Sequence, residues 1–239
     1  MTQHRSATAP ARRSFLSRLA AGAGAFGAAF AGAGAASAQP AASAARTPFV
    51  PAKHPEDDWF DQTTAGHRFF LDSTTAEAGG QALFFARNVF AANASGYKLT
   101  DADVAQIICL RHGSTSFGFN DAMWAKYGAA LSARSAGFVD PKTKQVPTFN
   151  VYLASSYGDA LRNGNVTIEQ MAKRGVRFAV CGLSTRATAQ LAAQKGGGNA
   201  DAIFKELSEN MVPNAHLVPA GIVAVSRAQE RGYTYAYVE

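Results

Sequence analysis

The chain has 239 residues, of which 47% are hydrophobic, and its formal net charge of +6 comes from 23 Lys and Arg against 17 Asp and Glu. The first 38 residues hold four of these basic residues and no acidic one, so the formal charge of residues 39–239 is +2. This later part is long enough to bury one substantial core, and it has no basic run with interleaved aromatic residues, which argues against nucleic-acid binding.

The N-terminal segment has the features of an export signal. Arg12 and Arg13 precede an apolar pair, an uncharged Ala/Gly-rich run follows, and residues 36–38 form an A-x-A site. This order is typical of a twin-arginine signal peptide and predicts cleavage after Ala38. The run is too poor in Leu, Ile and Val to predict a spanning anchor. We expect a periplasmic protein that folds before export and has no stable membrane insertion after cleavage.

Residues 39–64 are rich in Ala, Pro and charged residues, which predicts a flexible linker before a folded domain at residues 65–239. The linker contains His54, Asp57 and Asp58, and His67 follows it. These side chains can ligate metals, but their spacing matches no known ligand pattern. We therefore predict no metal site here.

Strand and helix patterns alternate along the rest of the chain. Apolar runs predict strands at residues 67–72, 105–113, 149–154, 176–181 and 233–238. Capping residues at 74–75, 120 and 167 predict helix starts, and further helices are predicted over residues 200–211 and 221–229. Because most of the strands are apolar throughout, the pattern predicts a single α/β domain with a mostly parallel sheet of about five strands and helices on both faces.

The fourth predicted strand ends at Cys181, and Gly182 separates it from Ser184 and Thr185, where a helix is predicted to begin. Open α/β sheets place their ligand sites at the carboxyl ends of such strands. The helix N-terminus and nearby Arg186 would lower the pKa of a thiol at this place and make it reactive. Alternatively, Cys181 is only a small buried hydrophobic residue, and the local sequence does not choose between the two.

His112 occupies the equivalent place at the end of the second predicted strand. It can act as a base or hydrogen-bond donor in a site, or it can bond only to the loop backbone. Trp124, on the helix that follows, is a further candidate to line a pocket. Cys109 lies inside a strand whereas Cys181 ends one, which argues against a disulfide, although adjacent strands can bring two cysteines within range.

Glycines at residues 196–198 lack the Lys-Ser/Thr of a phosphate-binding loop and do not follow a strand, so we interpret them as a flexible connection. We predict no cofactor. Residues 132–147 carry lysines without apolar periodicity and are expected to form a loop insertion.

Three segments carry a family resemblance: GVRFAVCG at 175–182, LVPAGIVA at 217–224 and QERGY at 229–233. With them, the chain from about His67 to its end resembles the DsrE/DsrF-like family of small sulfur-relay proteins. The resemblance implies a flavodoxin-like parallel sheet, a trimer or hexamer, and a cysteine that carries a persulfide, which Cys181 matches. The chain departs from the sulfur-relay members in its predicted export and in its insertion at residues 132–147.

The expected function is a persulfide carrier or sulfurtransferase-like protein, with a sulfur donor or acceptor protein as its partner. Cys181 would take sulfane sulfur as a persulfide and pass it to an acceptor thiol. The alternative is a non-catalytic oligomeric protein that binds a small ligand between His112, Trp124 and Tyr127. A hydrolase with Cys181 as nucleophile and His112 as base has less support, because no Asp or Asn orienter and no oxyanion motif stands out.

Overall fold

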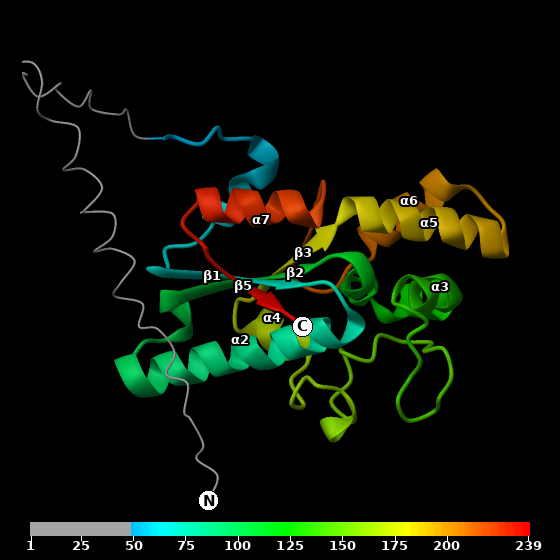
Figure 1. The fold of residues 1–239 in the computed structure, drawn as a ribbon, viewed down its shortest axis with the longest axis horizontal. Coiled ribbons are helices and arrows are strands. Elements are labelled where there is room, and N and C mark those ends of the chain that lie inside the picture. Colours follow the sequence, from blue (N-terminus) through cyan, green and yellow to red (C-terminus); the bar gives the residue numbers. More distant parts are fainter. Residues whose placement is uncertain (1–48) are drawn as a thin grey trace, which may run out of the picture. The chain divides into compact units, whose positions relative to one another are not determined.

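A sheet of five parallel strands lies at the centre of the computed structural model, which describes residues 49–239 (Figure 1). The strand order is β4-β3-β2-β1-β5, and all neighbouring strands are parallel. The strands are β1 His67–Ser73, β2 Val104–Leu110, β3 Arg177–Cys181, β4 Ala215–Val218 and β5 Thr234–Val238. The predicted parallel α/β sheet is therefore confirmed. The predicted signal peptide at residues 1–38 lies outside the described residues.

Helices cover both faces of the sheet. α7 lies on one face and α2 and α4 on the other, while α3, α5 and α6 gather beyond the carboxyl ends of the central strands (Figure 1). This is a flavodoxin-like three-layer arrangement, in which the last strand rather than the second lies on the far side of β1. The α-helices are α2 Ala76–Tyr97, α3 Asp121–Arg134, α4 Ile168–Lys173, α5 Gly182–Gly196, α6 Ala200–Glu209 and α7 Gly221–Glu230. Short 3₁₀ helices are η1 Pro55–Asp61, η2 Asp101–Asp103, η3 His112–Gly118 and η4 Gly158–Ala160.

The two faces of the sheet bury separate hydrophobic clusters. Successive side chains of a strand point to opposite faces, so Ile108 and Leu110 of β2 pack toward α2 while Ile107 and Cys109 pack toward α7. All seven residues of β2 are buried, as expected for a central parallel strand. The apolar runs in the sequence therefore reflect burial on both faces.

The prediction of a strand at residues 149–154 is wrong. These residues form turns in the loop between α3 and α4. Val151 and Tyr152 are buried in the core without joining a sheet, and the other apolar side chains of the segment are partly buried against it. Asn150 donates its side-chain amide to the carbonyls of Phe117 and Phe119, and the Tyr152 hydroxyl donates to Ala76 O. The fifth strand of the sheet is instead β4, an edge strand. Because it has only four residues, its sequence shows no clear strand pattern.

The linker prediction also needs correction, because the folded part begins before residue 65. Trp59 and Phe60 of η1 are buried in the cluster beneath α7. Asp57 forms ion pairs with Arg227 and Arg231, which fix η1 to the end of α7. Asp57 and Asp61 are thus partners of basic groups in the domain, whereas Glu56 and Asp58 are exposed.

Side-chain caps begin several helices where the sequence predicts them. Thr75, Asn120 and Thr167 each accept a hydrogen bond from a backbone N–H in the first turn of α2, α3 and α4. The helix after Cys181 begins earlier than predicted, at Gly182, so no loop separates it from the strand.

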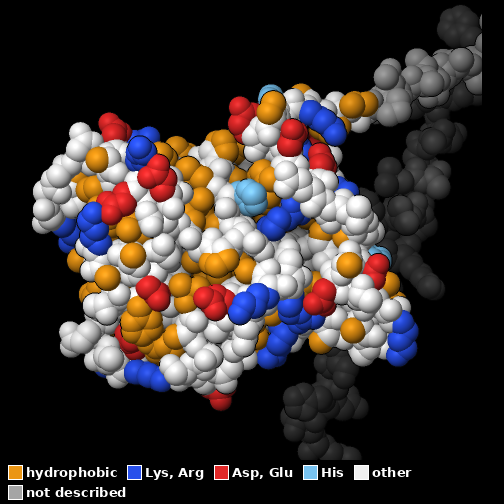
Figure 2. All heavy atoms as spheres, turned by 180° about the vertical axis from the view of Figure 1, so that it is seen from behind, with side chains coloured by type: hydrophobic (Ala, Val, Ile, Leu, Met, Phe, Trp, Pro, Cys, Tyr) orange, Lys and Arg blue, Asp and Glu red, His pale blue; other side chains and the backbone are white. Residues whose placement is uncertain are grey.

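One face of the molecule, seen in Figure 2, carries interspersed basic and acidic side chains with hydrophobic side chains between them. No single sign of charge dominates this face, in keeping with the low formal charge of residues 39–239. Within residues 49–239, no helix has both the length and the hydropathy that crossing a bilayer requires.

Candidate functional site

Cys181 lines a cavity of about 240 Å³ at the carboxyl end of the sheet. The thiol-bearing residue ends β3 and is also the N-cap of α5, and only 6% of it is exposed. α7 begins at Gly221 on the far side of the cavity, so two helix N-termini flank it. The lining residues are Arg111, His112, Arg134, Cys181, Leu183, Ser184, Ala220, Gly221 and Ile222.

Two glycines allow these helices to start so close to the neighbouring strand ends. A Cβ atom at Gly182 would lie 2.8 Å from Val218 O, and one at Gly221 would lie 2.6 Å from Arg111 Cβ and 3.1 Å from Cys109 Sγ. Any larger residue at either position would push the helix away from the sheet. Both glycines fall within the segments that carry the family resemblance.

His112 and Ser184 connect the end of β2 to α5. The backbone of His112 is left-handed, with φ at 54°, and its N–H donates to Ser184 Oγ at 3.2 Å. The His112 side chain is exposed and lines the cavity. The structure thus places the predicted residues His112, Ser184 and Cys181 together.

Arg111 brings a guanidinium group to the same cavity. It donates from Nε and Nη2 to the two carboxylate oxygens of Asp72, both at 2.8 Å, and Asp72 is completely buried. The Tyr235 hydroxyl donates to Asp72 Oδ2 at 3.0 Å. These hydrogen bonds raise the pKa of Arg111, so this group is a fixed cation whose charge Asp72 balances.

Arg134, the last residue of α3, also lines the cavity, and its Nε is buried without a hydrogen-bond partner among the described residues. No carboxylate of residues 49–239 forms an ion pair with it. A buried donor without a partner costs free energy unless an acceptor arrives. Arg134 therefore gives the cavity a positive charge that no carboxylate of the described residues balances.

Three residues predicted for the site lie elsewhere or have another role. Arg186 points to α6, where it forms an ion pair with Asp201 and lies 3.8 Å from the centroid of the Phe204 ring. Trp124 is 1% exposed and donates its indole N–H to Ser116 O, so it belongs to the core. Thr185 is buried and donates its hydroxyl to Cys181 O, one turn back in the helix.

Cys109 and Cys181 are both free thiols. Cys109 pairs in register with Ala179, so Cys181 lies two residues further along the adjacent strand, on the same face. Standard sheet spacings then separate the two Cα atoms by roughly 8 Å, beyond the reach of an unstrained disulfide. Burial raises the pKa of the Cys109 thiol well above its ordinary value, and the Asp72 carboxylate adds to this effect. Cys109 is therefore an inert core residue.

Neither Arg111 nor Arg134 is predicted as a site residue from the sequence. Arg111 stands directly before His112 at a strand end, a position that the strand pattern alone marks as a candidate. Arg134 reaches the cavity only because α3 packs against α5, and nothing in its local sequence indicates this.

No protein-family model, curated protein or solved structure matches this chain. The resemblance to the DsrE/DsrF-like family stays a prediction that rests on three segments. Two of these segments, 175–182 and 217–224, form the strand ends and helix starts around the Cys181 cavity.

Proposed function

We propose that this protein is a persulfide carrier or sulfurtransferase-like protein in which Cys181 holds the transferred sulfur. The observation that supports this most is the position of Cys181, which lines a cavity beside Arg134, Arg111 and the first turns of α5 and α7. Partial positive charge at helix N-termini and guanidinium groups both favour an anionic sulfur over a neutral one.

The chemistry needs no net oxidation. The Cys181 thiolate attacks the outer sulfur of a donor persulfide, R–S–SH; a new S–S bond forms, the old one breaks, and the donor leaves as R–S⁻. An acceptor thiolate then attacks the outer sulfur of Cys181–S–SH, and the Cys181 thiolate leaves. Each step starts or ends with an anionic sulfur in the cavity.

Arg134 is the residue that would stabilise these anions most. Asp72 already balances the charge of Arg111, so Arg111 adds little net field in the cavity. Arg134 has no such partner among the described residues and lines the same cavity as Cys181, so its guanidinium would be available to a sulfur anion there. His112, exposed at the mouth, is placed to exchange protons with a departing thiolate.

Exposed apolar residues at the cavity suit a protein partner. Leu183 is 68% exposed and Ile222 is 61% exposed, and both line the cavity; Val223 follows on α7 at 40%. A sulfur donor or acceptor protein would cover these side chains while its cysteine reaches Cys181. We further propose that the protein works in the periplasm after twin-arginine export and forms a homo-oligomer, in line with its family resemblance.

The test is intact mass of the purified mature protein before and after incubation with polysulfide. We expect wild type to gain the mass of one or more sulfur atoms, reversibly with reductant, and Cys181→Ser to gain none. Cys109→Ala is the matched control and should behave as wild type, because Cys109 is buried and inert. Unmodified wild type, or equal modification of Cys181→Ser, would contradict the proposal.

The alternatives from the sequence have less support. The alternative of a small-ligand-binding protein predicts that Trp124 and Tyr127 line the pocket together with His112. Trp124 is instead in the core, and Tyr127 lines a separate cavity with residues 195–198. The Cys181 cavity is also smaller than the roughly 300–1,000 Å³ typical of drug-sized ligands. For the hydrolase, the imidazole of His112 has no orienting hydrogen bond within residues 49–239.

A further inference from the structure

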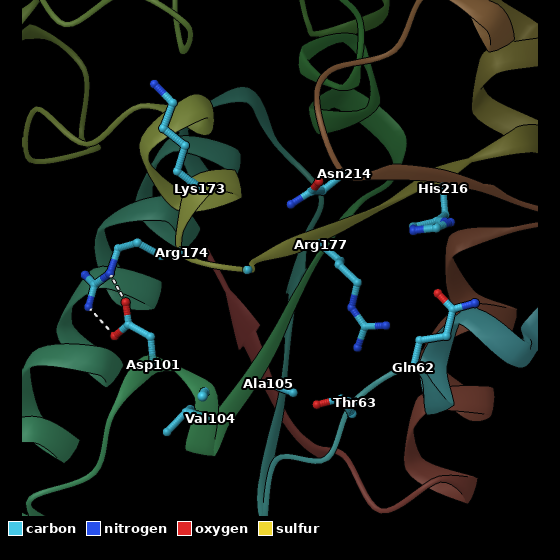
Figure 3. A pocket seen from close by; sticks show the side chains of 12 residues that line it. Gln62, Thr63, Asp101, Val104, Ala105, Lys173, Arg174, Arg177, Asn214 and His216 are labelled. Carbon is cyan, nitrogen blue, oxygen red and sulfur yellow. Dashed lines mark hydrogen bonds and ion pairs between the residues drawn. The ribbon is translucent and has the colours of Figure 1, made fainter.

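A cavity of about 640 Å³, shown in Figure 3, is lined by residues at the amino ends of β2, β3 and β4, the opposite end of the sheet from Cys181. It is surrounded by the segment after η1 and by the starts of β2, β3 and β4. Its lining residues are Gln62, Thr63, Asp101, Ala102, Val104, Ala105, Lys173, Arg174, Gly175, Arg177, Asn214 and His216. The proposed sulfur chemistry makes no use of this cavity.

Arg177, the first residue of β3, extends toward the middle of the cavity in Figure 3. Its guanidinium donates to Trp59 O and to the Tyr233 hydroxyl, the latter at 2.7 Å, and lies 5.5 Å from the centroid of the Trp59 ring. These partners are all neutral. No carboxylate among residues 49–239 lies within ion-pair distance of this half-buried cation.

The cavity has an excess of positive charge. Within residues 49–239, Asp101 is its only acidic lining residue, and Arg174 binds both of the Asp101 carboxylate oxygens at 2.7 Å (Figure 3). Lys173 and Arg177 remain without a carboxylate within the described part of the chain. A guanidinium has five N–H donors, and Arg177 uses only two nitrogens on neutral acceptors, so it can still bind an oxyanion.

The walls around Arg177 are fixed before any ligand binds. The His216 ring stacks on Trp59 with centroids 4.3 Å apart and planes 9° from parallel. Asn214 donates its side-chain amide to Ala172 O and Val176 O, which holds the loop before β4. Burial and the Arg177 charge lower the pKa of His216, so its ring is neutral at pH 7 and offers hydrogen bonds without adding charge.

We propose that this cavity binds a small molecule that carries a carboxylate or phosphate group, with the oxyanion on Arg177. Its volume falls within the range of roughly 300–1,000 Å³ found for small-molecule sites. The oxyanion supplies the charged acceptor that Arg177 lacks among the described residues, and Lys173 at the rim adds attraction without direct contact. The proposal is independent of the sulfur chemistry at Cys181, so either can fail alone.

Calorimetric titration of the mature protein with inorganic phosphate and with citrate, at low ionic strength and against sodium chloride, tests the proposal. Saturable binding of phosphate assigns the site to phosphate compounds, and binding of citrate assigns it to carboxylates. Arg177→Met should weaken binding by about tenfold or more, and Arg177→Lys should weaken it less, because lysine keeps the charge but loses the planar fork.

Lys173→Met keeps the test decisive if Arg177 variants do not fold, because Lys173 is exposed. It should weaken binding about two- to fivefold, an effect that added salt removes. Lys205→Met is the matched control, since Lys205 is an exposed lysine of α6 that does not line the cavity. No saturable binding of either anion, or equal binding by wild type and the folded Lys173→Met and Arg177→Lys variants, overturns the proposal.

Discussion

Two bidentate ion pairs lie at opposite ends of the sheet and differ mainly in burial. At the carboxyl end, Arg111 binds Asp72, whose side chain is completely buried. At the amino end, Arg174 binds Asp101, whose side chain is 42% exposed. Donor and acceptor atoms lie 2.7–2.8 Å apart in both pairs. Similar geometry therefore has different energetic consequences, because water screens one pair and not the other.

The largest expected effect is that of breaking the buried pair. Asp72→Ala leaves the Arg111 guanidinium without its partner and should lower the free energy of unfolding by about 3–5 kcal/mol. Asp101→Ala should lower it by less than about 1 kcal/mol, because that pair is exposed. Urea denaturation of both variants measures the difference, and equal losses would refute burial as its cause.

The next effect concerns the unbalanced cation at each end, Arg134 and Arg177. Arg134→Gln should slow the reaction of Cys181 with iodoacetamide at neutral pH about tenfold, since the thiolate loses a cation of its cavity that no carboxylate of residues 49–239 balances. Arg177→Gln should not change this rate, because Arg177 lies at the other end of the sheet.

Arg186→Gln is the control that separates sequence from structure in this assay. Arg186 is five residues from Cys181 but is bound to Asp201 and Phe204, so its removal should leave the iodoacetamide rate nearly unchanged. If Arg186→Gln reacts more slowly than Arg134→Gln, the sequence-based prediction that Arg186 stabilises the Cys181 thiolate would be favoured instead.

The smallest expected effect is a pH dependence at the amino end. Burial lowers the pKa of His216 below its ordinary value of 6.5, so the unfolded chain takes up a proton more readily than the folded one. The stability gained from neutral His216 is complete above pH 6.5 and falls as the pH drops through this value. Thermal unfolding between about pH 8 and pH 5 should show a shallower decline for His216→Phe, which keeps an aromatic ring against Trp59. Parallel profiles would contradict this role.

Local sequence patterns predicted the central strands and several helix starts well. β1, β2, β3 and β5 coincide with predicted apolar runs. For β2 and β3 the reason is that a parallel strand buried on both faces must be apolar along its length. β5 is an edge strand with mostly exposed residues, so this reason does not apply to it. The caps Thr75, Asn120 and Thr167 were predictable since a capping side chain acts on N–H groups within its own first turn.

The same patterns gave wrong predictions where apolar side chains are buried outside the strands and α-helices. Residues 149–154 are apolar enough for a strand, but Asn150 binds loop carbonyls and keeps the segment out of the sheet. Residues 55–61 look like a polar linker, yet Trp59 and Phe60 complete the core beneath α7. Composition alone does not show whether a buried apolar side chain belongs to a strand of the sheet or to a loop.

The sequence by itself determined the parallel α/β class and the place of Cys181 at a strand end, because both depend on neighbouring residues in the chain. Only the tertiary structure decided which charges surround that thiol. It turned Arg186 toward α6 and brought Arg134 to the cavity from the end of α3. A strand end limits where the backbone goes, whereas the neighbours of a side chain depend on how helices distant in sequence pack together.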